Sequence, residues 1–277
     1  MSRIRQITFE EASCMAPLFE GWQETTIWSF LQGCMGSGRI LENSTGEVVL
    51  GQITVGDFTF MAGDVLKADR EAAAELIGTR PAGFERTLLF MVPENESWNE
   101  LIEEVYGEDC QKITRYAIKK EPGIFDREKL EKMARQLPAG YCVVPMDEAL
   151  YETAKSQEWS KDFCAQYDTW EKYEKFGMGF MAVYSGELVG GVSSYSHYKE
   201  GIEIEIVTRE DHRRKGLAAA CAAHIILACM DRGLYASWDA ATQISVALAE
   251  KLGYHFDREY TAYKIDTGRH FKMNCKK

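Results

Sequence analysis

Residues 202–219 read IEIEIVTREDHRRKGLAA, an alternating segment followed by a charged turn and the start of an apolar run. In the alternating segment the three isoleucines share one side, whereas Glu203, Glu205 and Val207 share the other, which is typical of a β-strand. The run Leu217–Met230 is apolar except for His224, which predicts a buried helix. The stretch therefore predicts a strand, a basic loop and a helix, in that order.

The charged turn carries Arg213, Arg214 and Lys215 directly before Gly216. The first N–H groups of a helix have no partner within it, and the helix dipole favours negative charge there. A basic, glycine-containing turn at the start of a buried helix is therefore a place to hold phosphate groups. The alternative is a solvated cationic loop at an ordinary helix end.

Composition places the chain among ordinary globular proteins. It has 277 residues, of which 45% are hydrophobic and 27% charged, enough for one large domain or two of ordinary size. The net charge of −11 argues against a nucleic-acid-binding protein with a broad basic surface. No apolar run is long enough to span a bilayer, so we expect no membrane partner.

The cysteines indicate a reducing compartment. The 8 cysteines are irregularly spaced and include no C-x-x-C pair, which is typical of reduced, buried thiols and predicts a cytoplasmic protein. Cys221 and His224 stand at metal-ligand spacing, but no second pair accompanies them. We therefore expect a packed cysteine and a core histidine, and no metal.

The chain is predicted to form two parts that join near residues 120–140. Residues 1–125 are predicted to form a smaller α/β domain of unknown role, and residues 138–277 a second domain with a mixed sheet. Leu101–Gly107 and Leu248–Tyr254 are alike, and each precedes a predicted strand. Two explanations are open: the first domain is a degenerate copy of the second, or the likeness arose by chance. It has no basic glycine loop, so we assign it no cofactor.

A second motif begins at Trp238-Asp239 and ends with Glu250-Lys251-Leu252-Gly253-Tyr254. With the spacing Arg213-x-x-Gly216-x-Ala218, it resembles the GNAT superfamily of N-acetyltransferases across residues 141–265. The Trp238-Asp239 start, the long N-terminal half and Ser245 are most similar to the subfamily that contains zwittermicin A self-resistance acetyltransferases. Two positions depart from the superfamily pattern: Thr242 stands where Asn is usual, and Ala249 where many members have a Tyr that protonates the leaving thiolate.

The resemblance implies that a neutral amine attacks the thioester of acetyl-CoA directly. It implies that the N–H of Val207 stabilises the oxyanion where the strand parts from its neighbour. It also implies a set of acetyl-CoA-binding residues along the loop, the strand before it and the later motif. These are Val207, Thr208, Arg213, Arg214, Lys215, Gly216, Leu217, Ala218, Ala219, Thr242 and Ser245.

Glu203 and Glu205 are the candidates for removing the proton of the amine, directly or through water, and Glu205 is preferred by proximity. The alternative is that both are outward-facing strand residues. With Ala249 at the usual tyrosine position, the general acid is unassigned. Ser245, Tyr235 and Tyr254 can each donate, although both tyrosines can equally be core residues.

The acceptor is predicted to be a small-molecule primary amine. Residues 161–180 alternate aromatic and acidic side chains, which form either an acidic wall for a cationic amine or an amphipathic helix packed into the core. An oligomer is possible. Two rival functions remain: a non-catalytic acetyl-CoA-binding module, and a protein-interaction module whose loop is only a solvated helix end.

Overall fold

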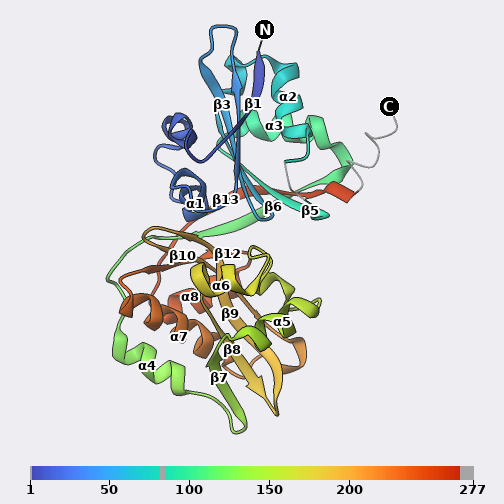
Figure 1. Ribbon diagram of the computed structural model, residues 1–277. Helices are drawn as coiled ribbons and strands as arrows, with labels where there is room; N and C mark the ends of the chain where they lie inside the picture. The colour runs from blue at the N-terminus through green and yellow to red at the C-terminus, as the bar shows by residue number, and fades with distance from the viewer. Residues whose placement is uncertain (1, 82–84, 269–277) are drawn as a thin grey trace. The chain divides into compact units, whose positions relative to one another are not determined.

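The computed structural model describes residues 2–81 and 85–268, and the chain divides into two compact units. Unit 1 comprises the described residues up to Arg115 and those from Glu259 onward. Unit 2 comprises Tyr116–Arg258. Strands β6 (Cys110–Ile118) and β13 (Phe256–Asp266) each run across a boundary between the units. Both units combine helices with a sheet, as Figure 1 shows.

Unit 1 is built on a mixed sheet with the strand order β1-β2-β3-β4-β5-β13-β6-β12. The last strand, β12 (Asp239–Ala240), pairs with Tyr116 and Ala117 of β6, which belong to unit 2 as β12 does. Strands β4 and β5 are parallel, whereas β1 to β4 pair antiparallel in succession. Its other elements are β1 (Arg3–Ile7), α1 (Thr25–Leu31), β2 (Ser37–Glu42), β3 (Val48–Val55), β4 (Phe58–Gly63), α2 (Arg70–Gly78), β5 (Leu88–Pro93) and α3 (Glu96–Tyr106). Short 3-10 helices occur at Ala12–Cys14, Ala16–Phe19, Val65–Lys67 and Gly107–Asp109.

The core of unit 1 follows from helix periodicity. Helix α3 buries Trp98, Leu101 and Ile102, which lie on one face at spacings of three and four residues. They pack in a cluster with Leu76 of α2 and Tyr263 of β13. Strand β13, the last strand in the described part of the chain, is therefore part of the core of unit 1.

Unit 2 is built on a mixed sheet whose strand order is β11-β10-β9-β8-β7. Strands β10 and β11 are parallel, and the remaining neighbours are antiparallel. The elements are α4 (Arg127–Arg135), β7 (Tyr141–Pro145), α5 (Glu148–Ser156), α6 (Trp170–Phe176), β8 (Gly179–Tyr184), β9 (Glu187–Tyr198), β10 (Gly201–Thr208), α7 (Leu217–Asp231), β11 (Tyr235–Ser237), β12 (Asp239–Ala240) and α8 (Gln243–Leu252). Two 3-10 helices lie at Lys161–Phe163 and Glu210–His212.

Helix α7 is the centre of the larger core cluster of unit 2, which confirms the predicted buried helix. Cys221, Ile225 and Ile226 are fully buried, because the helix packs on the sheet and is flanked by α4 and α8 (Figure 1). Cys221 belongs to this core, and His224 stacks on Phe180 at 5.4 Å. An all-round apolar helix is expected in such a position.

The two units repeat one order of elements. Each has a first strand, a helical segment, three antiparallel strands, a helix, a strand parallel to the one before that helix, and a further helix. In each, this last helix leads into a long strand, α3 into β6 and α8 into β13. The mixed α/β fold is confirmed, and the likeness of Leu101–Gly107 to Leu248–Tyr254 lies at matching places in the two copies.

The structure divides the chain differently from the predicted ranges 1–125 and 138–277. Helix α4 packs on α7 and belongs to unit 2, whereas Tyr263 and Ile265 of β13 are buried in unit 1. Residues 161–180 do not form one continuous amphipathic helix, because only Lys161–Phe163 and α6 are helical there. Which unit carries which role stays a prediction.

Candidate active site

The candidate site lies where β10 and β11 part. These parallel strands pair only from Gly201 with Tyr235 to Glu203 with Ser237, and β11 ends there while β10 continues to Thr208. Parallel strands end at the same edge of a sheet, so α7 after β10 and α8 after β11 both begin at this edge. Ligands of open α/β sheets bind outside such carboxyl ends.

The first turn of α7 leaves backbone donors outside the helix ladder. The first helical bond runs from the Ala220 N–H to the Gly216 carbonyl at 3.1 Å, so the N–H groups of residues 217–219 precede that ladder. Among the described residues no side chain caps this helix. Gly216 has a φ of +83°, and a Cβ there would meet only the Gln136 carbonyl oxygen, at 3.8 Å. An anion can therefore approach this backbone closely.

The basic side chains before Gly216 are fully on the surface. Arg213, Arg214 and Lys215 are exposed, and Arg214 adopts a φ of +61°. Arg213 Nε donates to the Thr208 carbonyl at 3.3 Å, and Lys215 Nζ donates to the Asp211 carbonyl at 3.0 Å. These bonds hold the loop beside the end of β10 while its positive charge faces solvent.

The backbone N–H of Val207 points to β9, away from the side on which β10 and β11 part. The Arg209 N–H donates to the Val189 carbonyl of β9 at 2.9 Å, and Val207 pairs with Gly191 in the same antiparallel ladder. Because backbone groups alternate along such a ladder, the N–H of Val207 also points to β9. The N–H groups that point to the parted side are those of Ile206 and Thr208. The oxyanion donor stays a prediction, with Ile206 and Thr208 as alternatives to Val207.

Both predicted carboxylates lie on β10, but in different surroundings. Glu203 is 7% exposed and lies opposite Ser196 on β9 and Ser237 on β11. Glu205 is half-buried, lies opposite Ser193, and is two residues beyond Glu203, the last residue that pairs with β11. Of the two, Glu205 is thus on the parted segment of the strand.

The predicted general acids differ in what their hydroxyls already bond. Tyr254 is buried and donates to the Ala236 carbonyl at 2.6 Å, and burial raises its pKa well above the usual value. Tyr235 donates to the Lys119 carbonyl at 3.2 Å, and burial raises its pKa to about 12. Ser245 Oγ accepts from Trp238 Nε1 at 3.0 Å, which leaves its own hydrogen for another acceptor.

The predicted cofactor-binding residues gather on three adjoining segments of unit 2. Thr208 ends β10, residues 213–219 form the loop and the first turn of α7, and Thr242 and Ser245 form the first turn of α8. Thr242 Oγ1 accepts from the Ser245 N–H at 3.2 Å, so Thr242 is the N-cap of α8. The helix starts that the sequence motifs indicate are therefore present.

The aromatic side chains of residues 161–180 are mostly core. Phe163, Tyr167 and Tyr173 are at most 3% exposed and pack in one cluster with α5. Phe176 alone is strongly exposed, and it stacks on His197 at 5.0 Å. These aromatic side chains therefore mostly pack into the core, and most of them do not form a wall for a cationic amine.

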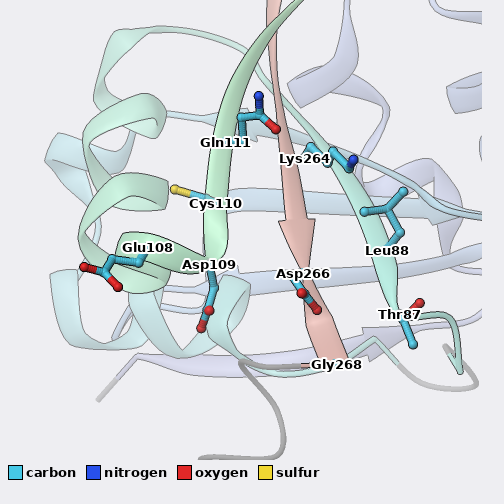
Figure 2. Close-up of a pocket in the computed structure, with 9 residues that line it drawn as sticks. All are labelled: Thr87, Leu88, Glu108, Asp109, Cys110, Gln111, Lys264, Asp266 and Gly268. Atoms are coloured by element: carbon cyan, nitrogen blue, oxygen red, sulfur yellow. The ribbon is translucent and has the colours of Figure 1, made fainter.

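A separate hollow of 790 Å³ lies in unit 1, at the ends of β5, β6 and β13. Figure 2 shows Lys264 and Asp266 of β13 between Cys110 of β6 and Leu88 of β5. Cys110 Sγ donates to the Gly107 carbonyl at 3.2 Å, and burial raises the pKa of this thiol. All predicted site residues lie in unit 2, so this hollow is distinct from them.

Sequence reasoning missed three residues that hold the basic loop: Tyr141, Arg209 and His212. His212 lies in the charged turn but is only 7% exposed, with both ring nitrogens in hydrogen-bonding contact. A charged turn predicts solvent exposure, so the sequence carries little signal for this burial. Over the described ranges 2–81 and 85–268, no group of three or more His, Cys, Asp or Glu is placed to bind a metal. In those ranges, too, no helix is long and apolar enough to cross a bilayer.

Comparison with known proteins gives matches along nearly the whole chain. A family model described as GNAT acetyltransferase matches residues 16–263. A GCN5-related N-acetyltransferase-like protein from Streptococcus suis 89/1591 is 41% identical, with a TM-score of 0.81 over 92% of this chain and 98% of that one. The uncharacterized N-acetyltransferase YdfB of Bacillus subtilis (strain 168) is 24% identical over 95% of this chain and 99% of its own length.

A more distant structure bears on the fold alone. A tandem GNAT protein from the clavulanic acid biosynthesis pathway has a TM-score of 0.54 and 11% identity, over 97% of this chain and 99% of that one. The tandem arrangement matches the repeated order of elements in units 1 and 2.

Proposed function

Since the chain belongs to the GNAT acetyltransferase family, we propose that it transfers an acetyl group from acetyl-CoA to the primary amine of a small molecule. The observation that carries the proposal is the start of α7, where three backbone N–H groups and a basic loop meet beside the parted strands. A diphosphate fits such a place, because donors and positive charge both point outward. We assign the transfer to unit 2 and no catalytic role to unit 1.

Acetyl-CoA supplies the activated acyl group, and this chain supplies position and proton transfer. The N–H groups of Leu217, Ala218 and Ala219, with Arg214 and Lys215, would hold the diphosphate. We assign stabilisation of the oxyanion of the tetrahedral intermediate to the backbone N–H groups of β10 that face the parted side, at Ile206 and Thr208. Their alternation along β10 makes them better candidates than Val207.

We assign removal of the amine proton to Glu205, which acts directly or through water. As the amine nitrogen bonds to the acyl carbon and the carbon–sulfur bond breaks, one proton must leave the nitrogen and one can reach the sulfur. Glu205 lies on the parted segment of β10, whereas Glu203 is paired on both sides. Ser245 is the candidate donor to sulfur. The pKa of a free thiol is about 8.5, so the thiolate is also a tolerable leaving group without a general acid.

The proposal is tested by thiol release from acetyl-CoA across a panel of small primary amines. We expect turnover with at least one amine, and a fall in kcat of about 100-fold for Glu205→Gln with unchanged acetyl-CoA affinity. The matched control is Glu203→Gln, which alters the neighbouring carboxylate on the same face. A larger fall in kcat for Glu203→Gln than for Glu205→Gln would overturn the assignment of the base.

The same experiment separates the rival functions. Acetyl-CoA binding without thiol release across the panel would favour a non-catalytic acetyl-CoA-binding module. Absence of acetyl-CoA binding at millimolar concentration would leave the protein-interaction module. Likeness to the subfamily of zwittermicin A self-resistance acetyltransferases stays a prediction, which zwittermicin A in the panel would test.

A further inference from the structure

One histidine is buried inside the otherwise exposed basic loop. His212 is 7% exposed, whereas Asp211 before it and Arg213 after it are exposed. Its Nδ1 lies 2.8 Å from the Tyr141 hydroxyl, and its Nε2 lies 2.9 Å from an Arg209 guanidinium nitrogen. Buried polar groups are expected to be satisfied in this way. The ring thus joins the loop to β7 and to the end of β10.

The partners fix the position of the histidine proton. An arginine guanidinium has donors and no acceptor, so Nε2 of His212 must accept from Arg209. In the neutral ring the proton is then on Nδ1, which donates to the Tyr141 hydroxyl oxygen. The arrangement needs a neutral imidazole, because a proton on Nε2 would point at a cation.

Arg209 extends this connection to two further places. Its guanidinium bonds Asp211 at 2.9 and 3.2 Å and Glu187, at the start of β9, at 3.2 Å. Its backbone N–H donates to Val189 of β9. The imidazole, the guanidinium and the Tyr141 hydroxyl therefore fasten the loop to β7, β9 and β10, immediately before the residues proposed to bind the diphosphate.

The other groups that face the imidazole do not replace these contacts. The Tyr141 and Tyr184 rings lie 5.6 and 5.5 Å from it, and Lys215 Nζ lies 5.6 Å from the Tyr141 ring. Asp211 Oδ2 is 3.4 Å from Nε2, but the same carboxylate bonds Arg209. A proton on Nε2 would face the Arg209 donor at 2.9 Å, so the contact with Arg209 would be lost even where Asp211 accepts from the ring.

We propose that neutral His212 is a positioning residue for the acyl-CoA loop, and that its protonation releases the loop and weakens acyl-CoA binding. This inference rests on the proposed function, because it concerns the same loop. The sign follows from the contacts: the binding-competent loop needs the unprotonated ring, so affinity is present at high pH and is lost as the pH falls. A loop held only by its backbone would show no such dependence.

The test is calorimetric titration of the full chain with 3′-dephospho-CoA. This probe keeps the diphosphate but lacks the 3′-phosphate. That phosphate takes up a proton at about pH 6, which would itself make the affinity depend on pH. Between about pH 8 and about pH 5.5, where histidines take up protons, we expect wild-type affinity to fall about tenfold. His212→Gln keeps an acceptor for Arg209 without a titratable ring, so its affinity is expected to stay within about twofold across this range.

The matched control is His224→Gln on α7, which replaces the histidine that stacks on Phe180 and is expected to keep the full pH dependence. Tyr141→Phe keeps the ring but loses the hydroxyl, so we expect weaker binding at about pH 8 and a smaller fall on acidification. This variant carries the test if His212→Gln does not fold.

Two outcomes would overturn the inference while leaving the proposed function intact. One is wild-type binding that is independent of pH or tighter in acid, and the other is a His212→Gln variant with the wild-type pH dependence. Absence of binding at about pH 8 to both 3′-dephospho-CoA and acetyl-CoA would instead overturn the proposed function, and this inference with it.

Discussion

The starts of α2 in unit 1 and α7 in unit 2 occupy the same place in two copies of one order of elements. At α7 the N-cap is Gly216, which has no side chain, and the preceding residues are basic. At α2 the N-cap is Asp69, whose carboxylate accepts from the Ala72 N–H at 3.0 Å. The carboxylate of Asp69 thus stands where an anion would bind.

The strand edge before α2 is also closed, unlike the edge before α7. Pairing of β4 with β5 continues to Met61 with Pro93, close to the end of β4. The Gly63 N–H donates to Glu94 Oε2 at 2.8 Å, and its carbonyl accepts from Trp98 Nε1 at 3.0 Å. In unit 1, side chains of the same unit therefore bond these backbone groups. The corresponding groups of unit 2 lie where its strands part.

This comparison teaches that strand order alone does not make an anion site. The same succession of strands and helices leaves donors open in one copy. In the other copy, carboxylates accept from the donors, and an indole N–H donates to a carbonyl. The chemistry follows from the capping residue and from how far the parallel strands stay paired.

The largest effect is expected from reversing charge at the open helix start. Arg214→Glu with Lys215→Glu places two carboxylates before α7, as Asp69 does at α2, and should weaken acetyl-CoA binding about 100-fold through repulsion at short range. Calorimetric titration measures it. Lys67→Glu, at an exposed lysine in the matching loop of unit 1, is the control and should leave affinity unchanged. Equal losses in both variants would contradict the difference between the units.

A smaller effect is expected from adding one methyl group at the N-cap of α7. Gly216→Ala strains a residue with a φ of +83° and should weaken acetyl-CoA binding about tenfold. Gly233→Ala is the matched control at the other end of α7, because Gly233 has a φ of +67° and a Cβ there would meet no described atom within 4 Å. Both variants should lose about 1 kcal/mol of unfolding free energy. A Gly216→Ala variant with wild-type affinity would show that the ligand does not approach this backbone.

The smallest effect is expected at the closed helix start. Asp69→Ala removes the cap of α2 and should lower the free energy of unfolding by about 1 kcal/mol, measured by urea denaturation. It should leave acetyl-CoA affinity unchanged, because Glu94 and Trp98 still satisfy Gly63. A change in affinity would mean that α2 takes part in acetyl-CoA binding.

Much of the fold and of the cofactor loop could be predicted from local sequence. The strand at residues 202–208 and the helix after Gly216 are predicted from alternation and from an apolar run, which depend on neighbouring residues, and both elements are present. The pairing of β13 with β5 could not be predicted, because no local pattern reveals which sheet a strand joins.

The site details that sequence missed depend on contacts between distant residues. The irregular pairing at Glu203 and Ile204, and the phase of the ladder beyond it, decide which N–H groups of β10 face the parted side, so the choice of Val207 could not be checked beforehand. His212 is buried because Tyr141, 71 residues earlier in the chain, bonds its ring. Neither contact leaves a mark on the residues around the loop.

The central claim, that unit 2 opens a helix start which unit 1 closes, is tested most directly by hydrogen–deuterium exchange with and without saturating acetyl-CoA. The account predicts slower exchange at residues 216–220 of the α7 start and unchanged exchange at residues 69–73 of the α2 start. Slower exchange at the α2 start, or unchanged exchange at the α7 start in the presence of bound acetyl-CoA, would contradict it.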